Sequence, residues 1–279
     1  MVSIRQELQE YGLSASKKLG QHFLTDRNIL NKVIRTAEVK PEDVILEVGS
    51  GLGGMTLALA EKANRVLTVE IDSRLVEQLK KKVSALSNIK VIEGDILKIH
   101  FDLLFREAGK PLKVVANLPY QISTPLLFRF IESKKFFSSF TLMLQRELAE
   151  RIVASPGGKA YGPLSIYMQL FLDLSIRFFI KPSAFFPPPQ VESAVVQMVW
   201  KEKPLIGVSE EEWFKKVVKA SFRYRRKTLI NSLKHSGLVH SFPLGREIEG
   251  IGIVAQRRPE TLSISEFIRL AEALKSLKI

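Results

Sequence analysis

Between residues 44 and 145, short apolar runs rich in β-branched side chains alternate with stretches of helical periodicity. The five runs cover residues 44–48, 66–71, 89–93, 113–116 and 140–144. This alternation is typical of parallel strands joined by right-handed helical crossovers. Helices are expected at residues 55–62, 74–86 and 125–132, the last with Thr124 as its N-cap and Pro125 in its first turn. The pattern therefore predicts an α/β fold with a mostly parallel sheet.

Two further strand-like runs, residues 174–180 and 191–200, bring the predicted sheet to seven strands, and we expect this pair at one edge. Beyond Lys203 the apolar residues recur at helical spacing instead. The sequence thus predicts two domains. Residues 1–203 hold the sheet, and residues 204–279 form a small all-α domain.

The chain has 279 residues and a formal net charge of +13, which favours a polyanionic partner, although a merely soluble basic protein is the alternative. The absence of cysteine excludes disulfides, thiol catalysis and thiolate metal ligands. The four histidines show no metal-ligand spacing, so no metal is expected. No apolar run is long enough to span a membrane. We therefore expect a cytoplasmic protein without a membrane partner. We also expect a monomer, since no exposed apolar helix is left unassigned.

A glycine turn, residues 47–54 (EVGSGLGG), follows the first predicted strand. Glycines allow positive φ and a close approach of the backbone to a ligand. Glu70 ends the second strand, where an acid can bind ribose hydroxyls. The same residues satisfy the dinucleotide fingerprint. By itself this motif fits a nicotinamide dinucleotide as well as S-adenosylmethionine, and tight strand-to-helix packing is the structural alternative.

Two motifs favour S-adenosylmethionine. Asp95 follows the third strand, where a carboxylate can accept a hydrogen bond from an adenine amino group, and Asn117-Leu118-Pro119-Tyr120 follows the fourth. An amide oxygen beside a backbone carbonyl can accept both hydrogens of a nucleobase amino group, while a tyrosine ring stacks on the base. Hydride transfer has no use for such a pair. The second motif therefore predicts methyl transfer to an amino nitrogen, with a purely structural turn as the alternative.

The last two strands are separated by a proline-rich loop that begins Phe185-Phe186-Pro187. A stiff loop at this point can prop an aromatic ring over the site, and Phe185 opposite Tyr120 would sandwich a base that leaves its RNA strand. Core packing of Phe185 or Phe186 is the alternative, and the sequence does not choose between the two rings.

Cations interleaved with aromatic residues mark a second kind of candidate site. Phosphate contact is the functional interpretation, and a solvated helix face is the structural one. The candidate RNA-binding residues are Lys17, Lys18, Lys159, Arg223, Arg225, Arg226 and Lys227.

Residues 18–24 (KLGQHFL) complete a set of ordered motifs. The others are EVGSGLGG, VEID, EGDIL, NLPYQISTPLL, YGPLS, FFPPPQVESAVV and FRYRRKTLINSL. Over nearly its whole length the chain resembles the ribosomal RNA adenine dimethyltransferases, and within them the bacterial enzymes of the small subunit. The family commonly has Asn where this chain has His22.

The resemblance implies a class I (Rossmann-like) S-adenosylmethionine-dependent methyltransferase domain. We therefore expect residues 1–203 to form the cofactor-binding catalytic domain and residues 204–279 to form a small helical RNA-binding domain. The resemblance also implies that the binding site for the cofactor, S-adenosylmethionine, is lined by His22, Leu24, Gly49, Glu70, Asp95 and Asn117. Glu47, Gly51, Ile71 and Ile96 adjoin these positions and are added as candidate contacts. The target adenine is expected at Asn117, Leu118, Pro119, Tyr120 and Phe185.

The family's reaction places two methyl groups on each of two adjacent adenosines in a hairpin loop near the end of small-subunit ribosomal RNA. The expected partners are thus that RNA and a precursor of the small subunit. Two alternatives stay open. One is the antibiotic-resistance relative that methylates one adenine of large-subunit RNA. By resemblance only, residues 225–233 favour the small-subunit enzyme over this relative. The other is a ribosome assembly factor that acts mainly by binding.

Overall fold

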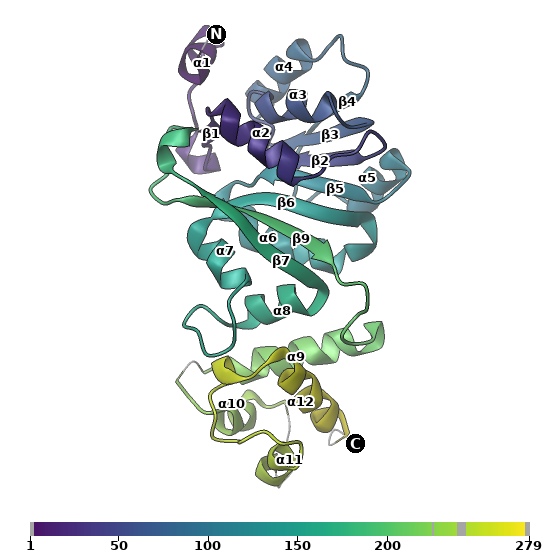
Figure 1. The fold of residues 1–279 in the computed structure, drawn as a ribbon, viewed down its shortest axis with the longest axis vertical. Helices are drawn as coiled ribbons and strands as arrows, with labels where there is room; N and C mark the ends of the chain where they lie inside the picture. The colour runs from purple at the N-terminus through teal and green to yellow at the C-terminus, as the bar shows by residue number, and fades with distance from the viewer. Residues whose placement is uncertain (1–2, 225, 239–243, 277–279) are drawn as a thin grey trace. The chain divides into compact units, whose positions relative to one another are not determined.

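The computed structural model describes residues 3–224, 226–238 and 244–276 (Figure 1). The chain divides into two compact units, residues 1–149 with 174–200 and residues 150–173 with 201–279. Every helix in the described part of the chain is too short or too polar to cross a membrane.

The first unit is built on a seven-stranded sheet with the order β4-β3-β2-β5-β6-β9-β7. The strands are β2 (Val44–Val48), β3 (Arg65–Glu70), β4 (Ile89–Glu93), β5 (Leu112–Asn117), β6 (Phe137–Gln145), β7 (Leu172–Ile180) and β9 (Ser193–Trp200). Neighbours from β4 to β6 are parallel, and β9 runs antiparallel to β6. The predicted seven-stranded, mostly parallel sheet, with its last two strands at one edge, is confirmed.

A second, two-stranded sheet was not predicted. Strand β1 (Phe23–Leu24) pairs antiparallel with β8 (Phe185–Phe186), with Phe23 opposite Phe186. Strands of two residues carry no periodicity, so a sequence pattern cannot reveal them. This pairing ties the segment before α2 to the proline-rich loop, although the two are far apart in the chain.

Helices cover both faces of the large sheet (Figure 1). Those of the first unit are α1 (Ile4–Glu10), α2 (Arg27–Thr36), α3 (Gly54–Ala60), α4 (Ser73–Lys82), α5 (Phe101–Ala108) and α6 (Tyr120–Glu132), with the short helices η1 (Lys17–Leu19), η2 (Lys134–Phe136) and η3 (Pro182–Ala184). Because both faces are covered, β2 is buried at every residue, which is why it is a continuous apolar run.

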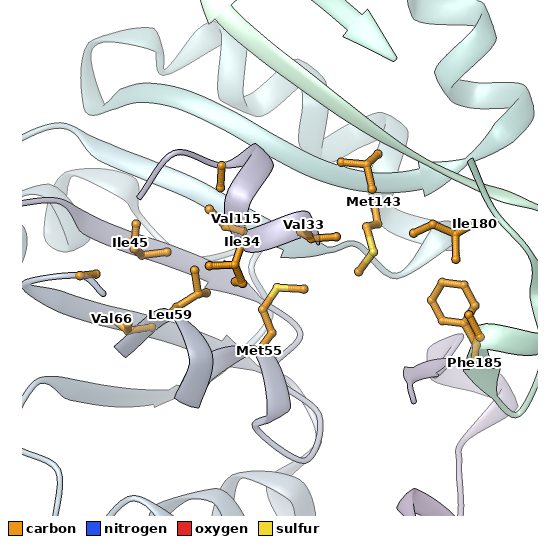
Figure 2. Packing of buried hydrophobic residues seen from close by; sticks show 14 residues of the cluster. Val33, Ile34, Ile45, Met55, Leu59, Val66, Val115, Met143, Ile180 and Phe185 are labelled. Atoms are coloured by element: carbon orange, nitrogen blue, oxygen red, sulfur yellow. The ribbon is translucent and has the colours of Figure 1, made fainter. Parts of the chain in front are cut away.

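The core on one face joins α2 and α3 to the strands, as Figure 2 shows. Val33 and Ile34 of α2 and Leu59 of α3 are at most 3% exposed. Val115 of β5 faces this cluster, and Phe185 closes it beside Ile180 at the far end of the view. On the other face Phe101, Phe130, Phe137 and Phe140 pack ring against ring. The sheet is therefore held rigidly between two apolar layers.

Helix α6 begins earlier than predicted. It spans Tyr120–Glu132, so Thr124 as N-cap is wrong; Pro119 takes the cap position and Pro125 lies inside the helix. Proline lacks an N–H, so the carbonyl four residues before it loses its helical partner. In the first turn, the Ser123 hydroxyl donates to the Pro119 carbonyl at 3.1 Å. The early start places Tyr120 at the end of β5.

The second unit is helical, as predicted for the C-terminal region. Its helices are α8 (Pro163–Phe171), α9 (Glu211–Ser221), α10 (Leu229–Ser236), α11 (Leu244–Gly250) and α12 (Ile264–Ser276), with η4 (Val208–Glu210) and η5 (Pro259–Thr261). Helix α7 (Arg146–Ile152) crosses from the first unit into the second.

The predicted domain boundary at residue 203 placed residues 150–173 with the sheet. In the structure they pack with the C-terminal helices instead, and Gly157 donates its N–H to the Glu260 carbonyl at 2.7 Å. Assigning catalysis and RNA binding to separate domains stays a prediction.

Candidate cofactor and target-base site

The polar residues singled out from the sequence meet at the carboxyl ends of β2 to β5. Glu47 lies within β2, Glu70 ends β3, Asp95 follows β4 and Asn117 ends β5. Carboxyl ends of parallel strands lie along one edge of a sheet, so these four side chains share that edge. The N-terminal segment adds Leu24 of the short strand β1 and His22, which directly precedes that strand.

The glycine turn after β2 has the backbone that only glycine adopts easily. Gly49, Gly51 and Gly53 have φ of 77°, 55° and 81°. A Cβ on Gly51 would lie 2.9 Å from the Phe23 ring, and one on Gly53 would lie 2.4 Å from Leu79. The turn therefore needs glycine for its conformation and for close packing, and it exposes backbone to the cleft.

Glu70 is held by backbone N–H groups at the end of β3. It accepts hydrogen bonds from Gly51 at 3.0 Å, Ile71 at 2.9 Å and Asp72 at 3.0 Å. Its side chain is buried, and burial raises its pKa although the three N–H groups oppose the shift. The carboxylate is therefore pre-oriented, and it also pins the glycine turn to β3.

Glu47 is 1% exposed and accepts a hydrogen bond of 2.6 Å from the Thr56 hydroxyl. Burial raises its pKa to about 7, with a smaller contribution from the charge of Glu70. Ser50 stands close by, and its buried hydroxyl has no hydrogen-bond partner among the described residues. A carboxyl group and an unpaired hydroxyl that line one cavity are suited to a polar ligand.

Asp95 follows β4 and lines a cavity together with Ile71 and Ile96. Asp95 accepts the N–H of Leu97 at 2.9 Å, which fixes its carboxylate, and it remains 27% exposed. Ile96 is buried and Ile71 is 49% exposed. These residues can surround a flat heterocycle with one hydrogen-bond acceptor at its rim.

Asn117 is oriented by the N-terminal segment. Its Nδ2 donates to the carbonyl oxygen of His22 at 2.9 Å, and the next residue, Leu118, donates its N–H to Met143 at 3.2 Å. Because the amide is planar, Oδ1 is turned away from the His22 carbonyl. The Leu118 side chain is buried, so this residue offers only backbone to the cleft. The pair supplies two acceptors at the end of β5.

The Tyr120 side chain is held by two contacts, one to its hydroxyl and one to a face of its ring. Its hydroxyl lies 2.7 Å from the Ser193 hydroxyl, and its ring stacks on His22 with centroids 5.5 Å apart and planes at 30°. His22 Nδ1 donates to the Pro187 carbonyl at 2.6 Å, because a carbonyl oxygen can only accept. Burial raises the pKa of the Tyr120 hydroxyl, which is therefore uncharged at neutral pH.

Phe185 does not lie opposite Tyr120 as an open ring. It is 3% exposed and belongs to the core cluster with Ile180 and Met143 (Figure 2). The core-packing alternative therefore describes this conformation, because β8 turns Phe185 inward and turns Phe186 toward Phe23. The proline-rich loop does support an aromatic pair, but that pair is His22 and Tyr120.

Three adjoining cavities follow the carboxyl edge of the sheet, and Gly49 lines all three. Their empty volumes are about 510, 490 and 490 Å³. The first contains Glu47 and Leu24, the second Tyr120 and Pro119, and the third Asp95. Together they form one elongated cleft that joins the acidic residues to the Asn117 motif.

A family model described as ribosomal RNA adenine dimethylase matches residues 12–275. The chain belongs to the ribosomal RNA adenine dimethylase family. The resemblance inferred from the motifs and the predicted enzyme class, an rRNA adenine dimethyltransferase, are confirmed.

Individual members of this family match over nearly the full length. The chain is 44% identical to ribosomal RNA small subunit methyltransferase A of Geobacter metallireducens, with 95% of this chain and 98% of that protein covered. The protein of the same name from Lactococcus lactis is also 44% identical, with 97% of this chain and 94% of that protein covered.

Solved structures show the same fold. A dimethyladenosine transferase of Plasmodium falciparum has 29% identity and a TM-score of 0.78, with 92% of this chain and 99% of that chain covered. The 23S rRNA methyltransferase ErmE, 24% identical with a TM-score of 0.70 and 91% and 99% covered, shares the fold. The class I methyltransferase fold is thereby confirmed.

The predicted RNA contacts of this dimethylase-family chain fall in both units. Lys17 and Lys18 are exposed in η1, close in sequence to His22. In the second unit Lys159, Arg223 and Arg226 are exposed. Lys227 is half-buried, with its ammonium 5.0 Å from the Tyr224 ring centroid. Arg225 lies outside the described residues. Phosphate binding by these cations stays a prediction.

Sequence reasoning missed two residues of the site. Gln21 donates to Asp72 at 3.1 Å and accepts from the Ser16 N–H at 2.8 Å, which fastens the N-terminal segment to the loop after β3. Ser193 holds the Tyr120 hydroxyl. Their partners lie 51 and 73 residues away in the chain, and no local pattern signals such contacts.

Proposed function

We propose that this dimethyltransferase transfers methyl groups to the exocyclic amino groups of two adjacent adenosines in the 3′-terminal hairpin loop of small-subunit ribosomal RNA. The observation that carries the proposal is the fixed amide of Asn117 beside the glycine cleft. The full-length relatives named small subunit methyltransferase A support the choice of RNA. Acting on a small-subunit precursor, it would serve ribosome biogenesis in the cytoplasm, as a monomer.

S-adenosylmethionine is the proposed methyl donor, and it supplies an electrophilic sulfonium methyl group when bound. The residues present fit it. Gly49 and Gly51 of the glycine turn line the cleft, and the Ser50 hydroxyl there is buried and unpaired within the described residues. Glu70 would hold the ribose, Asp95 with Ile71 and Ile96 the adenine, and Leu24 and Glu47 the methionine end.

The chain's own residues activate the target base by position. The Oδ1 of Asn117 and the Leu118 carbonyl would accept the two amino hydrogens. These bonds would hold the nitrogen pyramidal, so that its lone pair is no longer delocalised into the ring. The Tyr120 ring would stack on the base, a contact worth roughly 1 to 3 kcal/mol per base. Aim and proximity then supply most of the acceleration, and the motif contains no carboxylate to act as a general base. The amine would shed its proton late, and the pocket must tolerate the first methyl before the second is added.

Labelled S-adenosylmethionine and undermethylated small ribosomal subunits would test this function. The methyl groups are then located and counted by mass spectrometry of RNA fragments. Dimethyladenosine at two adjacent positions of the terminal hairpin is the expected result. Label in large-subunit RNA would assign the chain to the resistance-type activity instead, and tight subunit binding without any label would favour a role in assembly by binding alone.

A further inference from the structure

Two contacts leave the Tyr120 ring little freedom. Tyr120 is the first residue of α6 and follows shortly after β5, which ends at Asn117, so the sheet sets the position of its backbone. The hydroxyl at one end lies 2.7 Å from Ser193 Oγ, and one face of the ring stacks on His22 at 5.5 Å. A stacking platform held at its tip and on one face is pre-organised for a flat ligand.

Both contacts depend on the loop between β8 and β9. The Pro187 carbonyl accepts the bond from His22 Nδ1, and Ser193 is the first residue of β9, opposite Gln145 in the antiparallel ladder. Ser193 is 1% exposed, so its hydroxyl is shielded from water. Consecutive prolines stiffen the loop between these points because each fixes φ. The loop therefore holds the position of two aromatic rings without contributing a ring of its own to the cleft.

We propose that Ser193 is a positioning residue for methyl transfer, which fixes the plane of the Tyr120 ring against which the target adenine stacks. This inference rests on the proposed role of Tyr120. Without the Ser193 hydroxyl, the phenol oxygen of Tyr120 would lose this partner, and the ring would tilt toward another one. A small misplacement of a positioning group slows a reaction that depends on aim.

The test is a double-mutant cycle on the full-length protein. Ser193→Ala and Tyr120→Phe each remove one partner of the same hydrogen bond while they preserve the fold and the ring. Each single variant should lower the single-turnover methylation rate about tenfold, and the double variant should be no slower than either. The dissociation constant for S-adenosylmethionine, measured by calorimetry, should stay within about twofold. Ser221→Ala is the matched control, since the hydroxyl of this buried serine donates to the Val217 carbonyl within α9, and its loss should not change the rate.

A second readout does not depend on turnover. In protein labelled with ¹³C-tyrosine, the ring signals of Tyr120 are identified by their loss in Tyr120→Phe, and Ser193→Ala should shift them while Ser221→Ala does not. Unchanged ring signals, an unchanged rate in Ser193→Ala, or losses that multiply in the double variant would overturn the proposal. A wild-type protein that transferred no methyl would refute the proposed function, and the ring signals would still decide whether Ser193 holds Tyr120.

Discussion

The side-chain amide of Asn117 donates to the backbone carbonyl of His22 at 2.9 Å, although 95 residues separate the two in the chain. The bond joins the end of β5 to the segment that pairs with the proline-rich loop. It fixes which end of the amide faces the cleft, since the donor end is occupied. The acceptor end is therefore available to a ligand without any rearrangement.

Replacement of Asn117 by Ala should reduce turnover far more than cofactor affinity. The single-turnover rate is expected to fall about a hundredfold or more, because one of two acceptors for the amino hydrogens is gone. The dissociation constant for S-adenosylmethionine should change by less than about threefold. Asn64→Ala, at an exposed position, provides the control. An unchanged single-turnover rate in Asn117→Ala would remove the role assigned to the amide.

The glycine turn gives a prediction about stability. Gly51→Ala places a side chain at φ 55° and 2.9 Å from Phe23, so the thermal midpoint should drop by an amount equivalent to about 2 kcal/mol. Gly54→Ala is the matched control, because a Cβ there meets nothing within 4 Å at an ordinary helical position. Equal midpoints for the two variants would show that the turn tolerates a side chain.

Glu47 predicts a pH dependence of stability. Its pKa is raised from 4.5 to about 7 in the folded protein, so between these values the native state binds more protons than the unfolded state. The free energy of unfolding should therefore fall as the pH rises from about 4.5 to 7. The shift corresponds to roughly 3 kcal/mol at most, since one pKa unit is about 1.4 kcal/mol.

Glu47→Gln removes this titration while it keeps an acceptor for Thr56. The ligand-free variant should be more stable than the wild type above pH 7 and equal to it near pH 4. Urea denaturation midpoints of both proteins across this range would measure the difference, with the exposed Glu42→Gln as control. A constant offset between variant and wild type at all pH values would contradict the role of ionisation.

Phosphate contact by the second unit is testable through salt. Arg226 is exposed, so Arg226→Ala should weaken RNA binding without disturbing the fold. The slope of log K against log salt concentration should become shallower by about 1, as expected for the loss of one phosphate contact. Lys40→Ala is the control, because Lys40 precedes β2 and lies at the amino ends of the strands, away from the cleft. Equal slopes for Arg226→Ala and the wild type would show that Arg226 is a solvent-exposed residue of the segment between α9 and α10 that makes no phosphate contact.

The seven strands of the large sheet and the edge that carries the site could be predicted because both depend on local patterns. β-branched runs marked all seven strands of the large sheet, and parallel pairing puts Glu47, Glu70, Asp95 and Asn117 at one edge. Boundaries were less predictable. The start of α6 was misplaced because proline is favoured in a first turn, whereas here Pro125 lies deeper inside the helix.

Local chemistry in the chain was enough to establish the sheet, the glycine cradle and the Asn117 motif, since each depends on neighbouring residues. The partners of these residues came from long-range packing. Phe185 turned inward because β8 pairs with β1, and the rings that face each other are His22 and Tyr120. Contacts such as Ser193 to Tyr120 depend on how the loop after β8 returns to the sheet. A pattern along the chain does not contain that information, because the folded backbone alone brings such distant side chains within hydrogen-bond distance.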